Sequence, residues 1–217
     1  CLVGSEMCIR DRFLAEVAPK PLAAIVKPAV ELLAGIPSVI YGLLGIYLLN
    51  PLMYKLERLI FQGSTTHQFT GGANLLSAVI VLAIMILPTV INISETSIRA
   101  VPAGIKSSSL ALGASHVQTI FRSILPAAKS GILAGVILGV GRAIGETMAV
   151  IMVAGNQARM PKGILQGVRT MTANIVLEMG YATDLHREAL IATAVVLFVF
   201  ILVINLSFSI ISRKANA

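Results

Sequence analysis

The stretch ALIATAVVLFVFILVINLSFSII, residues Ala189–Ile211, runs without a single charged side chain. A helix needs about 20 apolar residues to cross the hydrocarbon core of a bilayer, so this stretch predicts a membrane-spanning helix. Three further segments are long and apolar enough for the same role, namely Ala29–Leu49, Leu75–Ile93 and Ile132–Ala154. The sequence therefore predicts an all-α fold, a polytopic transmembrane helical bundle with four spans.

The composition of the whole chain agrees with membrane residence. Of its 217 residues, 56% are hydrophobic and 12% are charged, and the mean hydropathy is +0.88. A soluble domain carries about a quarter charged residues, so the composition is that of a membrane protein. The net charge is +7, but the basic residues lie between apolar spans and near the C-terminus, where they orient loops and meet lipid headgroups. We therefore expect contact with the lipid bilayer and none with nucleic acid.

The first twelve residues, CLVGSEMCIRDR, differ in character from the rest of the chain. They show neither a signal-peptide layout nor a helical period, and they resemble the translated adapter sequence found at the ends of metagenomic gene models. We interpret residues 1–12 as a non-native scar and residues 13–217 as an N-terminally truncated transmembrane domain. Both cysteines, Cys1 and Cys8, lie in the scar, which excludes disulfides and cysteine-based metal sites from the remainder.

The connection between the second and third spans, Ser97–Pro126, is too polar to span and too regular to be a passive loop. A short helix is expected at Ile105–Leu112, stopped by Gly113. Ser115 and Gln118 then have the spacing of a capping box, which opens a second helix that should end at Leu125–Pro126. This second helix carries an apolar stripe made of Val117, Ile120, Phe121 and Ile124. The pattern alone fits either a hairpin resting on lipid headgroups or a docking element for a partner.

The same connection resembles a cytoplasmic signature of ABC importer permeases. That signature reads Glu-Ala-Ala, three residues, Gly, nine residues, Ile, one residue, Leu-Pro. Here the glycine and the Leu-Pro pair are in place, while serines stand at the glutamate and isoleucine positions, Ser107 and Ser123. The resemblance implies that the loop inserts into a groove on an ATPase subunit, through a set of contact residues: Ser107, Leu110, Gly113, Phe121, Leu125 and Pro126.

Three further strings resemble phosphate permeases of the PstC type: ELLAGIPSVIY at Glu31–Tyr41, GVGRAIGETMAVIMVAGN at Gly139–Asn156 and RTMTANIVLEMGY at Arg169–Tyr181. This resemblance implies a type I ABC importer permease fold in which four of six spans are visible. It also implies phosphate as the substrate and three protein partners: an ATPase subunit, a second homologous permease in a heterodimer, and an extracytoplasmic phosphate-binding protein. The implied location is the bacterial inner membrane, and a slight excess of Lys and Arg places the loop and the C-terminus in the cytoplasm.

Arg142 and Glu146 are charged residues inside the predicted third span. In a continuous helix they are four residues apart and share a face. Charges inside a membrane are costly and mark transport paths by default, and the planar guanidinium fork suits phosphate. A carboxylate repels phosphate, so the pair either locks the helix packing or opens and rearranges during transport. Thr147 could add a hydroxyl donor to the path or bond back to its own helix.

The sequence contains no Walker A motif and no evident nucleophile–base pair, so we expect a transport subunit and not an enzyme. We also expect no cofactor and no metal site, because His67, His116 and His186 lie far apart and form no ligand motif. The preferred hypothesis is a permease subunit of an ATP-driven phosphate importer. One alternative is a permease of the same fold for another oxyanion such as sulfate or molybdate. The other is an ion-coupled secondary carrier or channel, although the sequence shows no inverted repeat.

Overall fold

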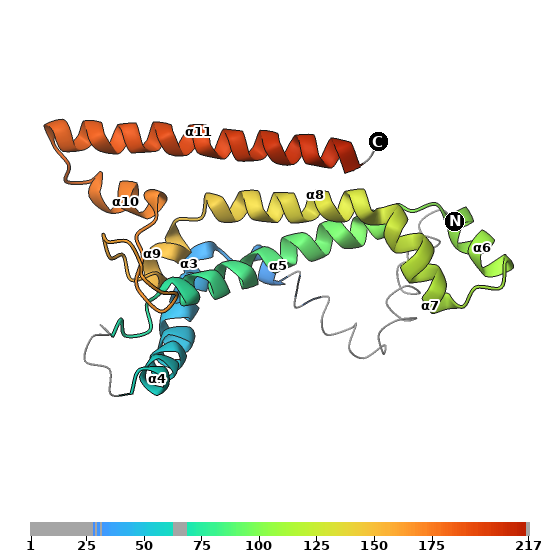
Figure 1. Ribbon diagram of the computed structural model, residues 1–217, viewed down its shortest axis with the longest axis horizontal. Helices are drawn as coiled ribbons and strands as arrows, with labels where there is room; N and C mark the ends of the chain where they lie inside the picture. Colours follow the sequence, from blue (N-terminus) through green and yellow to red (C-terminus); the bar gives the residue numbers. More distant parts are fainter. Residues whose placement is uncertain (1–27, 29, 31, 63–68, 216–217) are drawn as a thin grey trace. The chain divides into compact units, whose positions relative to one another are not determined.

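The computed structural model describes residues 28, 30, 32–62 and 69–215 (Figure 1). The predicted scar, residues 1–12, and Glu31 lie outside these residues. Within the described ranges the regular elements are helices, and the one β-bridge joins Gly155 to Val168. Among the residues that the structure describes, four helices are long and apolar enough to cross a membrane: Ser38–Ile60, Leu75–Arg99, His116–Ile144 and Asp184–Phe208. The prediction of an all-α, four-span protein is confirmed.

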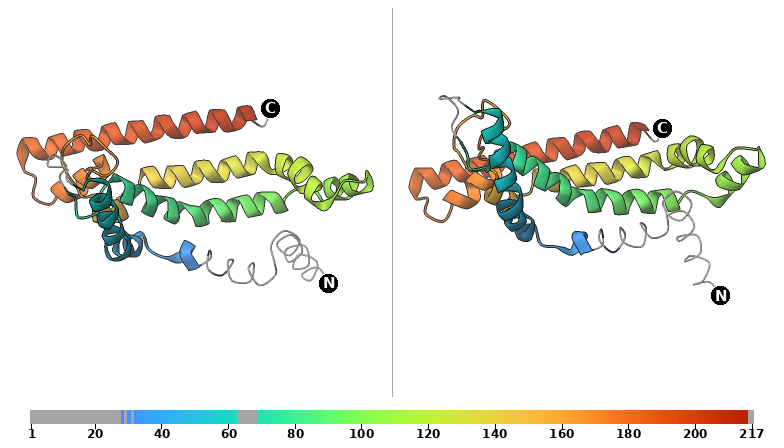
Figure 2. Two further views of the ribbon diagram at one scale, coloured as in Figure 1. Left: turned by 60° about the horizontal axis from the view of Figure 1, so that its bottom comes forward. Right: turned by 90° about the horizontal axis from the view of Figure 1, so that it is seen from below.

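The chain divides into two compact units, which are described separately. The first unit contains residues 88–136, with the second part of α5 (Leu75–Arg99), α6 (Ala103–Ala111), α7 (His116–Thr119), the π-helix η2 (Ile120–Ile124) and the first part of α8 (Leu125–Ile144). Within this unit α5 and α8 run side by side (Figure 2). A Cβ atom on Gly131 of α8 would lie 2.5 Å from the Cβ of Ser97 on α5, so glycine lets the two backbones approach closely.

The second unit contains residues 36–87 and 137–217. It comprises α3 (Ser38–Leu44), the π-helix η1 (Gly45–Leu49), α4 (Asn50–Ile60), the first part of α5, α9 (Met148–Val153), α10 (Met171–Glu178) and α11 (Asp184–Ala215). Its core lies where α3 and η1 pack on α9: Val153 is fully buried, and a Cβ atom on Gly45 would lie 2.4 Å from the Cγ1 of Val153. By contrast, only 6% of the most apolar window of α11 is buried, so its apolar face is left for lipid or another chain.

The first span is displaced from its predicted position. We predicted a first span over Ala29–Leu49, whereas the spanning helix begins at Ser38 and continues to Ile60. Pro37 is extended, with φ −59° and ψ 143°, and it separates the span from the turn before it. The predicted end at Leu49 is wrong because helix α4 begins at Asn50 and continues the span.

Both π-helices end two residues before a proline, Pro51 in the first case and Pro126 in the second. The N–H of Asn50 bonds to the carbonyl of Gly45 before Pro51, and the N–H of Leu125 bonds to the carbonyl of Ile120 before Pro126. The wider turn moves carbonyls away from the proline ring, which would clash with them in an α-helix. The prediction that the second loop helix ends at Leu125–Pro126 is therefore wrong, since that helix continues into α8.

The third span is interrupted where we predicted one continuous helix, Ile132–Ala154. Helix α8 ends at Ile144, and α9 begins at Met148 after a three-residue break. Polar side chains in the break form hydrogen bonds with backbone groups that a helix end leaves without partners. Glu146 Oε1 accepts the N–H of Ala149 at 3.2 Å, and Thr147 Oγ1 donates to the carbonyl of Gly145 at 3.2 Å.

The second and fourth spans agree with prediction and are longer than expected. Helix α5 starts at Leu75 as predicted and extends past Ile93 to Arg99, where an ion pair with Glu95 closes its last turn. Helix α11 begins at Asp184 and extends to Ala215. Charged and polar residues at the ends of these apolar runs continue the helix, because a helix can extend beyond the bilayer core into water.

Candidate functional site

The loop between α5 and α8 contains a complete helix stop at Gly113. This residue has φ +84°, which is in the left-handed region that glycine tolerates best. Its N–H donates to the carbonyl of Leu110 at 3.0 Å, and the N–H of Ala114 donates to the carbonyl of Ser109 at 3.3 Å. These two bonds are those of a Schellman motif, so the predicted end of the first loop helix is confirmed.

The second helix of the loop starts at the predicted capping box. The N–H of Ser115 donates to Gln118 Oε1 at 3.0 Å, and the N–H of Gln118 donates to Ser115 Oγ at 3.2 Å. The reciprocal bonds fix the direction in which the chain enters α7. Together with the stop at Gly113, they join the short helix α6 by a defined turn to the helix that starts with α7 and continues through η2 into α8.

Apolar side chains of the loop are divided between the interior and the surface. Ile124 is buried at 6% exposure, whereas Phe121 and Val117 are 63% exposed and Leu112 at the turn is 89% exposed. Leu125 is 39% exposed. Such a cluster of exposed apolar residues beside a membrane is typical of a surface that another molecule covers.

Ser107 stands at the position where the importer signature has glutamate. Its side chain is exposed, and its hydroxyl donates to the carbonyls of Gly104 at 3.1 Å and Ala103 at 3.3 Å, both in the same helix. The hydroxyl is therefore satisfied within α6. Leu110 in the same helix is half-buried, and Pro126 is exposed at the start of α8.

Arg142, Glu146 and Thr147 all belong to the second unit, but Arg142 and Glu146 do not share the helix face that we predicted for them. Arg142 lies in the last turn of α8 with an exposed side chain, and the other two lie half-buried in the break before α9. The carboxylate of Glu146 caps α9, a position that also suits the dipole of that helix. Tyr41 of α3 belongs to the same unit and is buried at 5% exposure. Sequence reasoning did not identify Tyr41, although it ends one of the three PstC-like strings.

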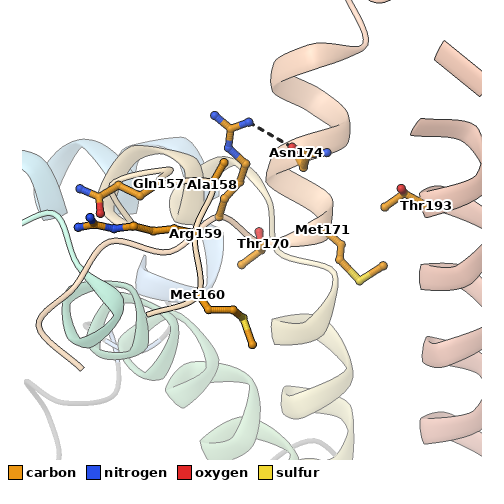
Figure 3. A pocket seen from close by; sticks show the side chains of 9 residues that line it. Gln157, Ala158, Arg159, Met160, Thr170, Met171, Asn174 and Thr193 are labelled. Carbon is orange, nitrogen blue, oxygen red and sulfur yellow. Dashed lines mark hydrogen bonds between the residues drawn. The ribbon is translucent and has the colours of Figure 1, made fainter. Parts of the chain in front are cut away.

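A hollow of about 340 Å³ lies between the chain after α9, the start of α10 and α11 (Figure 3). Arg159, Thr170, Asn174 and Thr193 are among its lining residues. The side chain of Arg159 extends toward Gln157 in Figure 3, whereas Arg169 bonds to Asn174 at 3.2 Å. The hollow therefore does not gather guanidinium groups around one point, as a dedicated oxyanion site would require.

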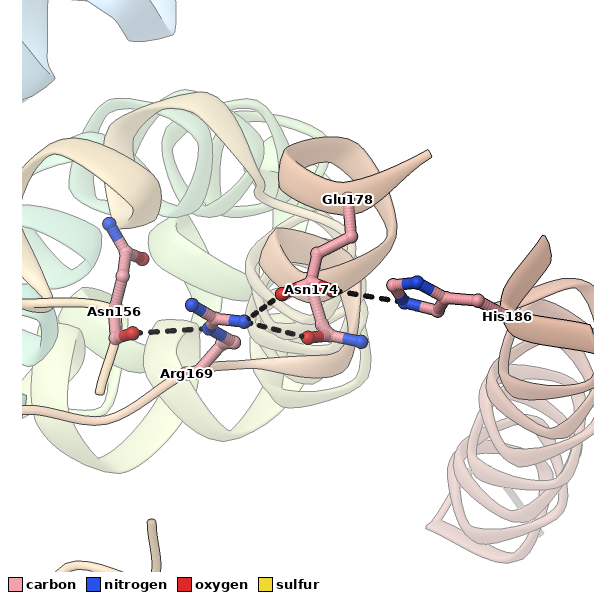
Figure 4. A network of polar contacts seen from close by, with 5 residues as sticks. All are labelled: Asn156, Arg169, Asn174, Glu178 and His186. Atoms are coloured by element: carbon pink, nitrogen blue, oxygen red, sulfur yellow. Dashed lines mark hydrogen bonds and ion pairs between the residues drawn. The ribbon is translucent and has the colours of Figure 1, made fainter. Parts of the chain in front are cut away.

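Arg169 is the centre of a polar network within the second unit, which joins the chain after α9 to α10 and to the start of α11 (Figure 4). Its Nε donates to the carbonyl of Asn156 at 3.1 Å, and its Nη1 donates to Asn174 Oδ1 at 3.2 Å and pairs with Glu178. Glu178 Oε2 also lies 3.0 Å from His186 Nε2 at the start of α11. The network thus connects the chain after α9 with α10 and α11.

This network was not identified from the sequence. Arg169 and Glu178 are nine residues apart and are 23% and 19% exposed at the side chain, a spacing that no local rule singles out. The available signal was that Asn156, Asn174 and both ionic residues fall inside two of the PstC-like strings. The side chain of His186 is 47% exposed and also contacts Glu178.

Among the described residues, no group of three or more His, Cys, Asp or Glu side chains lies close enough to hold a metal ion. The chemistry available at the candidate sites is therefore hydrogen bonding, charge and apolar contact. Those are the interactions that bind a partner chain or pass an ion along a path.

A family model described as "Binding-protein-dependent transport system inner membrane component" matches residues 13–216. Two similar sequences are described as phosphate transport system permease protein PstC. The Xylella fastidiosa (strain 9a5c) protein is 39% identical over 201 residues, covering 86% of this chain and 60% of that protein. The Mesorhizobium japonicum protein is 39% identical over 197 residues, with coverages of 86% and 60%. A probable ABC transporter permease protein of Bacillus subtilis, YqgH, is 38% identical over 199 residues, with coverages of 89% and 61%.

This chain spans about 60% of the length of the curated relatives that it matches. Its fold is similar to solved ABC importer structures at low sequence identity. One is an inward-facing MetNI methionine ABC transporter, with a TM-score of 0.64, 19% identity and coverages of 92% of this chain and 78% of that chain. Another is an amino acid ABC transporter with histidines, with a TM-score of 0.56, 19% identity and coverages of 95% and 84%. The predicted type I importer permease fold is confirmed.

Proposed function

Because the chain belongs to the family of binding-protein-dependent transport system inner membrane components, we propose that it is a permease subunit of an ATP-driven phosphate importer. The four apolar helices suit it to the bilayer. In this proposal ATP is hydrolysed by a separate ATPase subunit, and the chain supplies part of the path that phosphate follows.

The observation that carries the proposal is the geometry of residues 97–126. The Schellman stop at Gly113 and the capping box at Ser115 build a fixed turn between the short helix α6 and the helix that leads through α7 and η2 into α8. The turn presents Leu112, and the second helix presents Phe121, both largely exposed. Helices that only rested on headgroups would not need a turn fixed by two backbone–backbone and two backbone–side-chain hydrogen bonds, whereas a partner protein recognises a fixed shape. We assign this surface to the ATPase.

Phosphate is proposed as the substrate from the relatives and from the chemistry of Arg142. Proteins from Xylella fastidiosa and Mesorhizobium japonicum that resemble this chain are described as phosphate transport permeases. Arg142 lies at a helix end beside a break, with its side chain exposed in the isolated chain. A guanidinium placed there can offer two parallel N–H groups to an oxyanion. Glu146 and Thr147 then belong to the break that shapes the path.

Three partners complete the proposed importer. The apolar face of α11, which is almost entirely exposed, suits lipid and a second, homologous permease in a heterodimer. An extracytoplasmic binding protein delivers phosphate to the side opposite the ATPase. In this arrangement the chain lies in the bacterial inner membrane, and the 97–126 loop and the C-terminus are cytoplasmic.

A complementation experiment tests this function. The full-length protein, together with the permease, ATPase and binding protein encoded with it, is expressed in a bacterium that lacks its own phosphate importers, and uptake of labelled phosphate is measured at micromolar concentration. We expect uptake that is lost when the ATPase active site is inactivated and that excess sulfate or molybdate does not compete away. Competition by sulfate or molybdate would support the other oxyanion permease. Uptake that persists without ATP hydrolysis would support a secondary carrier.

A further inference from the structure

Three hydroxyl groups meet where the two short helices of the 97–126 loop cross. Ser109 comes from α6, Thr119 from α7 and Ser123 from η2. Ser109 Oγ lies 3.1 Å from Thr119 Oγ1, and Ser123 Oγ donates to Ser109 Oγ at 3.4 Å. Thr119 is 1% exposed, so its hydroxyl needs a partner inside the protein. We call these three residues the hydroxyl cluster.

The hydroxyl cluster differs from the other hydroxyl groups of the same unit. Ser107 on α6 and Thr96 on α5 both bond back to carbonyls of their own helices, which is the usual arrangement for serine and threonine in a helix. Ser109 instead bonds across to Thr119, which is ten residues further along the chain. A bond across two helices restrains the angle between them, whereas a bond within one helix does not.

The cluster also connects the exposed part of the loop to a membrane span. Ser123 belongs to η2, which continues into α8 without interruption. On the same helix, a Cβ atom on Gly135 would lie 3.0 Å from Ile93 of α5, so α8 is closely packed on α5 within this unit. A force applied to α6 therefore reaches the span through the hydroxyl cluster in addition to the turn at Gly113.

We propose that the hydroxyl cluster of Ser109, Thr119 and Ser123 is a brace that fixes the angle between α6 and α8 and transmits movement of the docked ATPase to the span. The transmission part rests on the proposed function, while the fixed angle does not. The three side chains are positioning residues, since they act through the helices that they join. A partner bound to α6 would otherwise tilt this helix about the turn without moving α8.

The experiment uses three variants of Thr119 and one matched control. Thr119→Val keeps the shape of the buried side chain and removes its hydroxyl, whereas Thr119→Ser keeps the hydroxyl. Thr96→Val removes a hydroxyl that is exposed and bonds only within its own helix. A third substitution, Thr119→Ala, shows how much of any effect comes from lost volume rather than the lost hydrogen bond.

The angle is measured first, and without any partner. Spin labels are placed at two exposed positions, Ser108→Cys on α6 and Lys129→Cys on α8, in the full chain with its own cysteines replaced, and the distance distribution is recorded in detergent. We expect Thr119→Val to widen this distribution about twofold, and Thr119→Ser and the control to leave it unchanged. An equally narrow distribution in Thr119→Val would overturn the brace, whatever the protein transports.

The transmission is measured in the reconstituted importer as ATP hydrolysed per phosphate imported. We expect this ratio to rise about three- to tenfold in Thr119→Val, as the loss of one hydrogen bond predicts, and to return to the wild-type value in Thr119→Ser. An unchanged ratio beside a widened distribution would overturn transmission. If the wild-type complex imports no phosphate, the proposed function fails while the spin-label result still decides the brace.

Discussion

Replacing Gly113 by valine should separate docking from membrane insertion. A Cβ atom at this position would meet nothing within 4 Å, so the substitution creates no clash. The substitution is unfavourable because Gly113 has φ +84°. This conformation costs an L-residue about 1–2 kcal/mol of free energy, and a β-branched residue lies in the upper part of that range. About 2 kcal/mol lowers the ratio of the native turn to relaxed alternatives about 30-fold. The relaxed turn loses the N–H bonds to Leu110 and Ser109, and with them the fixed presentation of Leu112.

The assay measures phosphate uptake and the amount of protein in the membrane for each variant. Gly113→Val should reduce uptake about tenfold or more at an unchanged membrane level, because the four spans do not depend on this turn. Gly113→Asn should retain most uptake, since asparagine tolerates the left-handed conformation. The matched control is Gly104→Val, where a Cβ atom also meets nothing within 4 Å and no positive φ is required. Equal uptake in Gly113→Val and Gly104→Val would refute the role of the turn in docking.

Four further substitutions test the second unit. A Cβ atom on Gly72 would lie 1.9 Å from the carbonyl oxygen of Asn50 at φ +86°, so Gly72→Ala should cost about 3 kcal/mol or more in thermal unfolding of the detergent-solubilised protein. Gly71→Ala, at φ +68° in open space, should cost only about 1–2 kcal/mol, and equal costs would contradict the close approach. Arg169→Lys cannot reproduce a planar fork with carbonyl, amide and carboxylate partners, so it should lower stability by about 1–3 kcal/mol; a wild-type melting temperature would show that the network is not structural. Arg142→Lys should reduce phosphate uptake about tenfold at an unchanged membrane level if a bidentate contact forms, and normal uptake would leave this residue only a point-charge role.

Local signals in the sequence predicted the loop between the second and third spans well. The stop at Gly113 and the capping box of Ser115 with Gln118 are each determined within one helical turn, and both form as predicted. Long apolar runs were equally informative, since α5 and α11 cover the predicted second and fourth spans. In these cases the residues that decide the structure lie next to one another in the chain.

Helix interruptions were harder to predict from the sequence. Proline usually ends a helix, but not every proline of this chain does so. Pro37 lies in the break directly before α3, whereas Pro51 and Pro126 lie beyond π-turns that accommodate them. Conversely, the third span breaks after Ile144, where the sequence contains no proline. Whether a π-turn forms depends on packing around the helix, which a single sequence does not display.

The residues that come together over long distances could not be predicted from spacing. Arg169 finds partners before and after it in the chain, and Ser109 meets Thr119 only because α6 folds back over the second loop helix. The predicted pairing face of Arg142 and Glu146 required a continuous helix, and it fails because α8 ends between them. The charged residues in the predicted span did not reveal that the helix is interrupted between them, or how their side chains are arranged.

The central claim is that this chain is a permease subunit for ATP-driven phosphate import. The most direct measurement is uptake of labelled phosphate into proteoliposomes that contain the full-length protein, its partner permease and the ATPase, with the binding protein outside and ATP inside. The account predicts uptake that requires both ATP and the binding protein and is unaffected by collapsing ion gradients. Phosphate uptake that continues without ATP and stops when an ion gradient is collapsed would contradict it.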